Sequence, residues 1–389
     1  MSRITDKDKK YIIGTYNRFP VTIVRGEGSL LFDESGREYI DLGSGIAVNS
    51  FGACDGEWYR AVCEQAGKIQ HASNLYYTEP CTTLAEALCT RAGMRKVFFS
   101  NSGAEANECA IKLARKYAFD KYGDGRYAVV TLNNSFHGRT LTTLAATGQE
   151  HYHGLFRPLT PGFCSVDAGD IAAIESIHGK TPVCAVMIEC IQGEGGVIPL
   201  DESFVKGLAA WCAENDVLLI VDEVQTGNGR TGEYFAYMNY GIKPDIVTTA
   251  KGLAGGLPIG ATLTGYKAEF TLGYGDHGST FGGNPVCCAA ALSIIGRIDD
   301  ALLCSVKEKG RFIKERLAGQ DGIEDVRGMG LMIGVKTVRP VAEVTARCIE
   351  RGILCLTAKD SLRLLPPLNI DKDILARALE IVEEACAAQ

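Results

Sequence analysis

Between about residue 96 and residue 292, the chain alternates short runs of apolar and β-branched residues with stretches of helical periodicity. This alternation predicts βαβ units, in which helices connect the strands of one mostly parallel sheet. We expect strands over residues 97–99, 127–131, 183–188, 217–221, 246–248 and 261–264. Ligands of open α/β sheets bind beyond the carboxyl ends of the strands, so the residues that follow these runs are the candidates for function.

The two ends of the chain have a different pattern. Residues 28–40 predict a β-hairpin, because two strand-like runs flank an Asp-Glu-Ser-Gly turn. Beyond residue 300 the pattern predicts an amphipathic helix (302–317), a glycine-punctuated strand (327–335) and a last helix from Asp371.

The length of 389 residues suits a two-domain enzyme. We expect the alternating region to form a large α/β domain and the two ends to pack together as a smaller α+β domain beside it. The expected division gives residues 48–292 to the large domain, and residues 1–47 and 293–389 to the small one.

Charge and composition exclude several classes of function. A formal net charge of −7 disfavours nucleic acid or an anionic membrane as a partner. No apolar run approaches the roughly 18 residues of a membrane span, and the polar N-terminus lacks the core of a secretory signal, so we expect a cytoplasmic protein. The fifteen cysteines are odd in number and include no Cys-x-x-Cys pair, so we expect buried thiols and no metal site.

Two of the expected strands deliver a charged residue at their carboxyl ends. Asp222 follows the run 217–221, and Lys251 follows the run 246–248 and precedes a glycine-rich stretch. A desolvated lysine keeps a neutral, nucleophilic amine that can form a Schiff base. A fixed aspartate can keep a pyridinium nitrogen protonated, and proteins hold pyridoxal phosphate (PLP) by this pair of groups. Lys251 alone would be interpreted as a solvated loop residue, so the pairing with Asp222 carries the hypothesis.

Small polar residues after the first expected strand indicate an anion site. Ser102, Gly103 and Ala104 stand between this strand and a helix, and Glu105 has capping-box spacing from Ser102. The backbone N–H groups of such a helix start can bind a phosphate. The alternative is a well-capped helix with nothing bound.

Three further segments contain candidate ligand-binding residues. Phe136 could stack on a planar cofactor and Arg139 could bind a carboxylate, although a core phenylalanine and a surface arginine remain alternatives. The hydroxyls of Ser279 and Thr280 lie in a glycine-rich loop and could donate to a phosphate or a carboxylate. Arg363 lies between leucines, where a buried cation needs a carboxylate from a ligand or from a structural salt bridge.

Two acids lie in the glycine-rich loop 188–196, which follows an expected strand. Glu189 and Glu194 could contact a ligand, pair with an arginine or remain exposed to solvent.

Taken together, these segments resemble the class III aminotransferases, a PLP-dependent family of fold type I. The resemblance extends from Phe19 to the last helix, and residues 45–49, 73–77, 102–107 and 229–236 are most similar to the acetylornithine aminotransferases. It implies a seven-stranded, mostly parallel sheet in the large domain, PLP as the cofactor, and a homodimer with shared active sites.

The resemblance also implies roles for the cofactor-binding residues. Lys251 would bind PLP covalently and move the proton, and Asp222 would face the ring nitrogen. Gln225 would contact the ring hydroxyl, and Val224 and Phe136 would enclose the ring. The remaining cofactor-binding residues would be Ser102, Gly103, Ala104 and Glu223, with Thr280 of the neighbouring subunit completing the phosphate site.

For the substrates, the resemblance implies two arginine sites. Arg139 would bind the α-carboxylate of N-acetylornithine and the distal carboxylate of 2-oxoglutarate, and Ser279 would line this pocket from the partner subunit. Arg363 would bind the α-carboxylate of 2-oxoglutarate, and Glu194 would shield it from other substrates. The expected reaction transfers the δ-amino group of N2-acetyl-L-ornithine to 2-oxoglutarate, which gives N-acetyl-L-glutamate 5-semialdehyde and L-glutamate in arginine biosynthesis.

Other functions remain open at this point. Succinylornithine, ornithine, N-succinyl-diaminopimelate and 4-aminobutyrate are alternative amines, because no residue in the sequence decides the acyl group. An aminomutase, epimerase or decarboxylase would keep the lysine without needing both arginines. Residues 218–223 also resemble a Walker B strand of a nucleotide hydrolase, but the only Gly-Lys-Thr, at 179–181, has Ile174 where the first Walker A glycine belongs.

Overall fold

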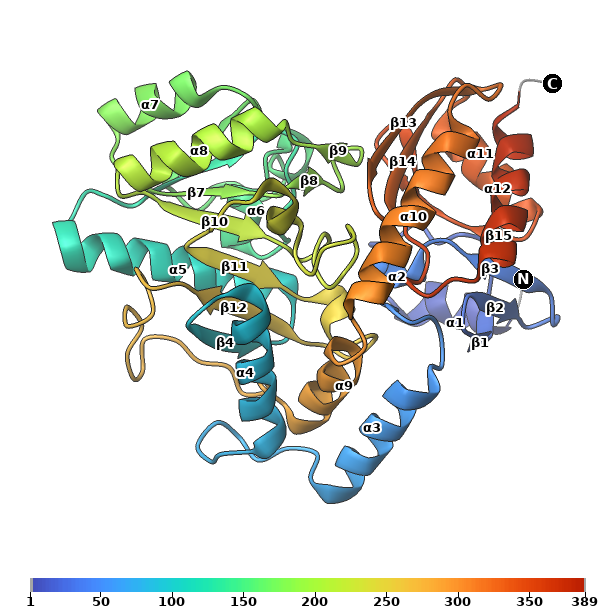
Figure 1. Cartoon of the computed structure of the whole chain (residues 1–389), viewed down its shortest axis with the longest axis horizontal. Coiled ribbons are helices and arrows are strands. Elements are labelled where there is room, and N and C mark those ends of the chain that lie inside the picture. Colours follow the sequence, from blue (N-terminus) through green and yellow to red (C-terminus); the bar gives the residue numbers. More distant parts are fainter. Residues whose placement is uncertain (1–2, 388–389) are drawn as a thin grey trace.

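The alternating runs form one seven-stranded sheet in the computed structural model, which describes residues 3–387 (Figure 1). The sheet has the order β4-β12-β11-β10-β7-β5-β6, and only β12 runs antiparallel to its neighbours. Its strands are Lys96–Ser100 (β4), Ala128–Leu132 (β5), Phe163–Val166 (β6), Val183–Ile188 (β7), Leu218–Asp222 (β10), Ile246–Thr249 (β11) and Gly260–Thr264 (β12). The six expected strands are confirmed, and β6 is an additional edge strand that the sequence analysis missed.

Helices cover both faces of this sheet, which explains why its central strands are apolar on both sides. Leu219 and Val221 of β10 belong to the core on the face of α4, α8 and α9, whereas Leu218 and Ile220 pack on the opposite face with α5. The larger helices of this part are α3 (Gly56–Lys68), α4 (Glu79–Ala92), α5 (Gly103–Tyr122), α7 (Ile171–Lys180), α8 (Glu202–Glu214) and α9 (Pro285–Ile295).

Shorter elements connect these helices and strands. They comprise α6 (Leu141–Ala146), the two-stranded pair β8 (Ile191–Gln192) and β9 (Ile198–Pro199), and the 3₁₀ turns η1 (Glu150–Tyr152), η2 (Ala236–Tyr240) and η3 (Lys251–Leu253).

Both ends of the chain contribute to a smaller α+β domain, on the right in Figure 1. One four-stranded sheet has the order β1-β2-β3-β15, and its parallel pair β3–β15 joins the N-terminal and C-terminal parts. The N-terminal elements are α1 (Arg3–Tyr11), β1 (Ile23–Glu27), β2 (Leu30–Asp33), β3 (Glu38–Asp41) and α2 (Ser44–Ala47). The C-terminal elements are α10 (Asp300–Leu317), β13 (Ile323–Met329), β14 (Met332–Thr337), α11 (Val341–Glu350), β15 (Ile353–Leu354), β16 (Leu356–Ala358), β17 (Ser361–Leu364) and α12 (Lys372–Cys386).

The expected hairpin at residues 28–40 is confirmed as the antiparallel pair β2–β3. The expectation of one strand over residues 327–335 is wrong, because this segment turns back on itself as the antiparallel pair β13–β14. Gly330 makes the turn with a φ of +53°, a conformation that glycine adopts without strain. The domain boundaries at residues 47 and 292 stay a prediction. None of the helices within residues 3–387 is both long enough and apolar enough to cross a membrane.

Three backbone segments meet closely where the small domain contacts the large one. The buried Arg230 donates hydrogen bonds to the carbonyl oxygens of Leu331 and Pro366. A Cβ atom built on Gly330 would lie 2.5 Å from the backbone of Thr231, and one built on Gly310 of α10 would lie 2.1 Å from the carbonyl oxygen of Gly330. The absence of side chains at the two glycines therefore sets how closely α10 and the β13–β14 turn approach the large domain.

A pair of glycine substitutions tests this packing. Gly310→Ala should lower the free energy of unfolding by about 1–3 kcal/mol, because the added methyl group must displace backbone atoms. Gly67→Ala is the control, because Gly67 also lies in a helix but has no atom within 4 Å of its added Cβ. The control should gain up to about 1 kcal/mol from helix propensity. Equal shifts of both variants in chemical denaturation would contradict the proposed close packing.

Candidate active site

A cavity of about 550 Å³ opens beyond the carboxyl ends of the central strands. This volume lies within the range of small-molecule sites. Nine residues that the sequence analysis singled out line it together: Ser102, Gly103, Ala104, Phe136, Arg139, Asp222, Val224, Gln225 and Lys251. Glu189 lines it as well. The sheet thus brings together groups that are up to 149 positions apart in the chain (251 − 102).

Asp222 and Lys251 come to the cavity from adjacent strands. Asp222 is the last residue of β10 and pairs in register with Thr248 of β11, and Lys251 follows β11 directly in the turn η3. Lys251 has a φ of +44°, a left-handed conformation that costs a non-glycine residue energy and is typical of functional sites. Burial lowers the pKa of the Lys251 amine, and the nearby Glu194 carboxylate opposes this shift. The lowered pKa favours the neutral amine that nucleophilic chemistry requires.

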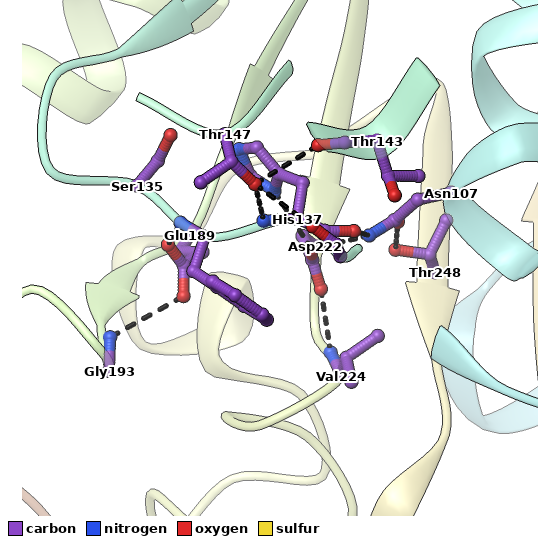
Figure 2. A network of polar contacts seen from close by, with 12 residues as sticks. Asn107, Ser135, His137, Thr143, Thr147, Glu189, Gly193, Asp222, Val224 and Thr248 are labelled. Carbon is purple, nitrogen blue, oxygen red and sulfur yellow. Dashed lines mark hydrogen bonds and ion pairs between the residues drawn. The ribbon is translucent and has the colours of Figure 1, made fainter. Parts of the chain in front are cut away.

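Three donors fix the Asp222 carboxylate (Figure 2). Its Oδ1 accepts the backbone N–H of Val224 at 3.0 Å. Its Oδ2 accepts from Asn107 Nδ2 at 2.7 Å and is 2.9 Å from His137 Nδ1. The sequence analysis missed Asn107. The available signal was a polar side chain at a position of α5 where Ala106, Ala110 and other helix neighbours are buried apolar residues.

The start of α5 lies at the cavity, and its role as an anion site stays a prediction. Ser102 is the N-cap, and its side chain accepts the backbone N–H of Glu105 at 3.2 Å. Glu105 in turn accepts the backbone N–H of Asn101 rather than that of Ser102, so the capping box is incomplete. A Cβ atom on Gly103 would lie 2.6 Å from Val224 Cγ1, so only glycine lets the helix start lie this close to Val224.

The two candidate arginines differ in their partners. The Arg139 guanidinium is exposed at the cavity and lies over the rings of Tyr152, at 4.5 Å, and Phe136, at 5.8 Å. Within residues 3–387 Arg139 has no carboxylate partner. Buried Arg363 donates from Nη1 to Glu194 Oε1 at 2.6 Å and to Gln225 Oε1 at 3.0 Å.

The Arg363–Glu194 ion pair affects both groups. Burial alone would raise the pKa of Glu194, but the Arg363 guanidinium holds this pKa below its ordinary value. The Nε atom of Arg363 is buried and has no hydrogen-bond partner among the described residues. The pair therefore leaves donor capacity on Arg363 that a second carboxylate could use.

Comparison with known proteins agrees with this geometry. Residues 12–386 match the model of the family described as Aminotransferase class-III. The chain belongs to the class III aminotransferases. It is 48% identical to an acetylornithine aminotransferase of Haemophilus ducreyi over 98% of both chains, and 43% identical to one of Methanocaldococcus jannaschii over 97% of this chain and 96% of the relative.

Solved structures show the same fold. An ornithine aminotransferase of Toxoplasma gondii superimposes with a TM-score of 0.93 at 31% identity, over 98% of this chain and 94% of the other. An N-acetylornithine aminotransferase of Stenotrophomonas maltophilia superimposes with a TM-score of 0.83 at 35% identity, over 98% and 97%. The fold is therefore that of the PLP-dependent aminotransferases of fold type I.

Ser279 and Thr280 of this class III chain do not line the Lys251 cavity of their own subunit. Ser279 Oγ is 3.2 Å from Asn101 Nδ2, and exposed Thr280 lines a separate hollow of about 140 Å³ with His71 and Asn74. The expectation that both residues act on the neighbouring subunit stays a prediction. The described part of the chain contains no group of three or more His, Cys, Asp or Glu side chains placed to bind a metal ion.

Glu223 does not line the cavity, and its expected contact with the cofactor stays a prediction. Because side chains alternate along a strand, the residue after Asp222 points away from the cavity. The Glu223 carboxyl accepts hydrogen bonds from Thr226 Oγ1 and, at 2.8 Å, from the backbone N–H of Tyr237. Burial raises the pKa of Glu223 to about 7. The Glu223 carboxyl therefore connects the turn after β10 to η2.

The raised pKa of Glu223 makes stability depend on pH. The buried carboxyl contributes fully below its ordinary pKa of 4.5 and loses this contribution as the pH rises through about 7, because the carboxylate must then carry a buried charge. Glu223→Gln keeps both hydrogen bonds and removes the titration. Its advantage over the wild type in unfolding free energy should grow by about 2–3 kcal/mol between about pH 5 and pH 8.

Denaturant titrations at several pH values measure this difference. Glu214→Gln, on the exposed surface of α8, controls for the loss of one negative charge. A difference between Glu223→Gln and the wild type that is independent of pH would contradict the shifted pKa.

Proposed function

We propose that this class III aminotransferase transfers the δ-amino group of N2-acetyl-L-ornithine to 2-oxoglutarate, with PLP as cofactor, in arginine biosynthesis. The proposal rests on one cavity that is lined by Lys251, Asp222 and Arg139. Beside it, Arg363 forms an ion pair with Glu194. The relatives named acetylornithine aminotransferase support this substrate over other ω-amines. The cytoplasm as its compartment stays a prediction.

The residues around the cavity fit PLP. The start of α5, at Ser102 to Ala104, offers backbone N–H groups to the phosphate. Phe136 and Val224 supply apolar faces for a flat ring, and Gln225 supplies a polar side chain at its edge. The Asp222 carboxylate fits a protonated ring nitrogen, and the Lys251 amine fits the aldehyde. When bound, PLP supplies an electron sink for the negative charge that develops at the reacting carbon of the substrate.

Lys251 carries the proton in this proposal. Its amine has a lowered pKa and reaches the cavity from the end of β11, next to Asp222 on the adjacent strand. With the cofactor bound, Lys251 would be the base that takes a proton from the δ-carbon of the amino donor and returns it during the transfer.

The two arginines explain how one site accepts two different substrates in turn. Acetylornithine reacts at a carbon without a carboxylate and presents its α-carboxylate to unpaired Arg139. 2-Oxoglutarate presents two carboxylates, one to Arg139 and one next to its reacting carbon. The second must compete with Glu194 for Arg363, and the buried Nε of Arg363 offers it a further donor.

A second subunit would complete the site. Thr280 and Ser279 lie outside the cavity of their own chain, and Thr280 is exposed in the single chain. We infer a homodimer in which Thr280 donates to the phosphate of the neighbouring site and Ser279 lines its substrate pocket.

Steady-state kinetics with a panel of amines test the proposed function. With 2-oxoglutarate as acceptor, kcat/KM should be highest for acetylornithine and lower for succinylornithine, ornithine, N-succinyl-diaminopimelate and 4-aminobutyrate. Lys251→Ala should remain folded and lose turnover of every amine. Borohydride should fix the yellow cofactor permanently to Lys251 in the wild type and leave the variant unlabelled. A colourless wild-type protein, or turnover that survives in Lys251→Ala, would sink the proposal.

The arginine assignments make a separate prediction. Arg139→Ala should reduce kcat/KM for both acetylornithine and 2-oxoglutarate by the equivalent of about 2–5 kcal/mol, because both lose a charge-assisted contact. Arg363→Ala should reduce it mainly for 2-oxoglutarate. Separate measurement of the two half-reactions distinguishes these effects, and an Arg139→Ala variant that uses acetylornithine normally would overturn the carboxylate assignment.

A further inference from the structure

We propose that Asn107, oriented by Thr248, is a positioning residue that holds the Asp222 carboxylate in register with the ring nitrogen of the cofactor. The inference rests on the proposed function, since it concerns how the chain prepares its own carboxylate for PLP. It adds two residues, neither of which carries a charge, to the machinery of the site.

The evidence is a continuous line of short hydrogen bonds from β11 to β10 (Figure 2). Thr248 Oγ1 donates to Asn107 Oδ1 at 2.6 Å, and Asn107 Nδ2 donates to Asp222 Oδ2 at 2.7 Å. The Nδ2 atom also donates to the carbonyl oxygen of His137 at 2.7 Å. All three side chains of the line are buried, with Thr248 at 0%, Asn107 at 1% and Asp222 at 4% exposure, so solvent does not compete for these bonds.

The partners of Asn107 fix which way its amide faces. An asparagine amide has two N–H donors and one oxygen, and here both donors and the oxygen have a partner. A flipped amide would turn its oxygen toward the Asp222 carboxylate and the His137 carbonyl, which are both acceptors. The Thr248 hydroxyl completes this arrangement, because it donates to the amide oxygen and so holds the amide where it donates to Asp222.

The positions of these residues connect the two ends of the cofactor site. Asn107 lies on α5, five positions after Ser102 at the predicted phosphate end of the same helix (107 − 102). Thr248 lies opposite Asp222 in the β10–β11 register. Helix α5 thus carries both the N–H groups predicted to bind the phosphate and the Asn107 amide that binds the Asp222 carboxylate. The distance between these two parts of the site is therefore fixed before the cofactor binds.

His137 is the other side-chain donor to Asp222, but its ring has fewer constraints. Its Nδ1 faces Asp222 Oδ2, while its buried Nε2 has no hydrogen-bond partner within the described residues. The Asn107 amide is held at all of its polar atoms and the His137 ring at only one. Asn107 is therefore the donor that defines where Oδ2 lies.

A neighbouring threonine provides a matched control. Thr262 lies on β12, is buried at 1% exposure, and donates from Oγ1 to the backbone oxygen of Ala106 at 2.7 Å. Thr262→Val and Thr248→Val thus remove the same hydroxyl, at the same depth, from bonds to adjacent residues of α5. Only the Thr248 bond leads to Asp222.

The test compares two ligands on the full-length protein after removal of its cofactor. Apo-protein is titrated with PLP and with its deaza analogue, in which a carbon replaces the ring nitrogen, and the ratio of the two dissociation constants is measured. Only PLP can use Asp222, so this ratio isolates the contact. Thr248→Val should reduce the preference for PLP by about two- to tenfold, the equivalent of one hydrogen bond between neutral groups. Thr262→Val should keep the wild-type ratio, and Thr248→Ser, which retains the hydroxyl, should restore it.

The outcomes separate the two proposals. A ratio that Thr248→Val leaves unchanged, while both affinities fall together, would mean that the line is only structural and would overturn the inference alone. Asn107→Leu, which removes the donor directly, should abolish the preference, and a retained preference there would also overturn it. A wild-type protein that binds neither ligand would overturn the proposed function and the inference with it, whereas equal binding of both ligands would overturn the inference alone.

Discussion

The structure depends on one demanding requirement: an aspartate must stay buried at the end of a central strand. Burying a carboxylate is costly unless hydrogen bonds replace its lost water. The donors to Asp222 come from the turn that follows β10, from helix α5 and from the loop after β5. Because these segments are far apart in sequence, the carboxylate is satisfied only when the whole sheet and its helix layer have formed. The site is therefore an integral part of the folded core.

The three basic side chains of the site, Arg139, Arg363 and Lys251, have different surroundings. Arg139 is held by aromatic rings, which attract a cation without neutralising it and leave its N–H groups free for a ligand. Arg363 is held by Glu194, which neutralises it and must be displaced. Burial lowers the pKa of Lys251 and so favours its neutral amine. Three basic side chains around one cavity thus have three different tasks, and their surroundings determine which task each one has.

The sequence predicted those parts that follow from local rules. Strands buried on both faces appear as uninterrupted apolar runs, and the rule that ligands bind beyond the carboxyl ends of the strands places Asp222 and Lys251 at the same edge of the sheet. The contact of Asn107 with Asp222 could not be predicted, because it depends on how α5 is rotated against the sheet. The β13–β14 turn at Gly330 was hidden inside a continuous strand-like pattern. Asp222 and Glu223 are neighbours in the sequence, but successive side chains of a strand point to opposite sides, and Asp222 lines the cavity whereas Glu223 does not.

The two acids of the cavity, Glu189 and Asp222, differ in how many donors they have. Burial raises the pKa of Glu189 to about 7, and the negative charge of Asp222 contributes to that shift. Among residues 3–387, Glu189 accepts from two backbone N–H groups, those of Phe136 at 2.9 Å and Gly193 at 3.4 Å. Asp222 has three donors, two of them on one oxygen at under 3 Å. Hydrogen bonds from the protein replace the water that a carboxylate loses on burial. The donors around Asp222 therefore hold its position and offset the cost of burying it at the end of β10.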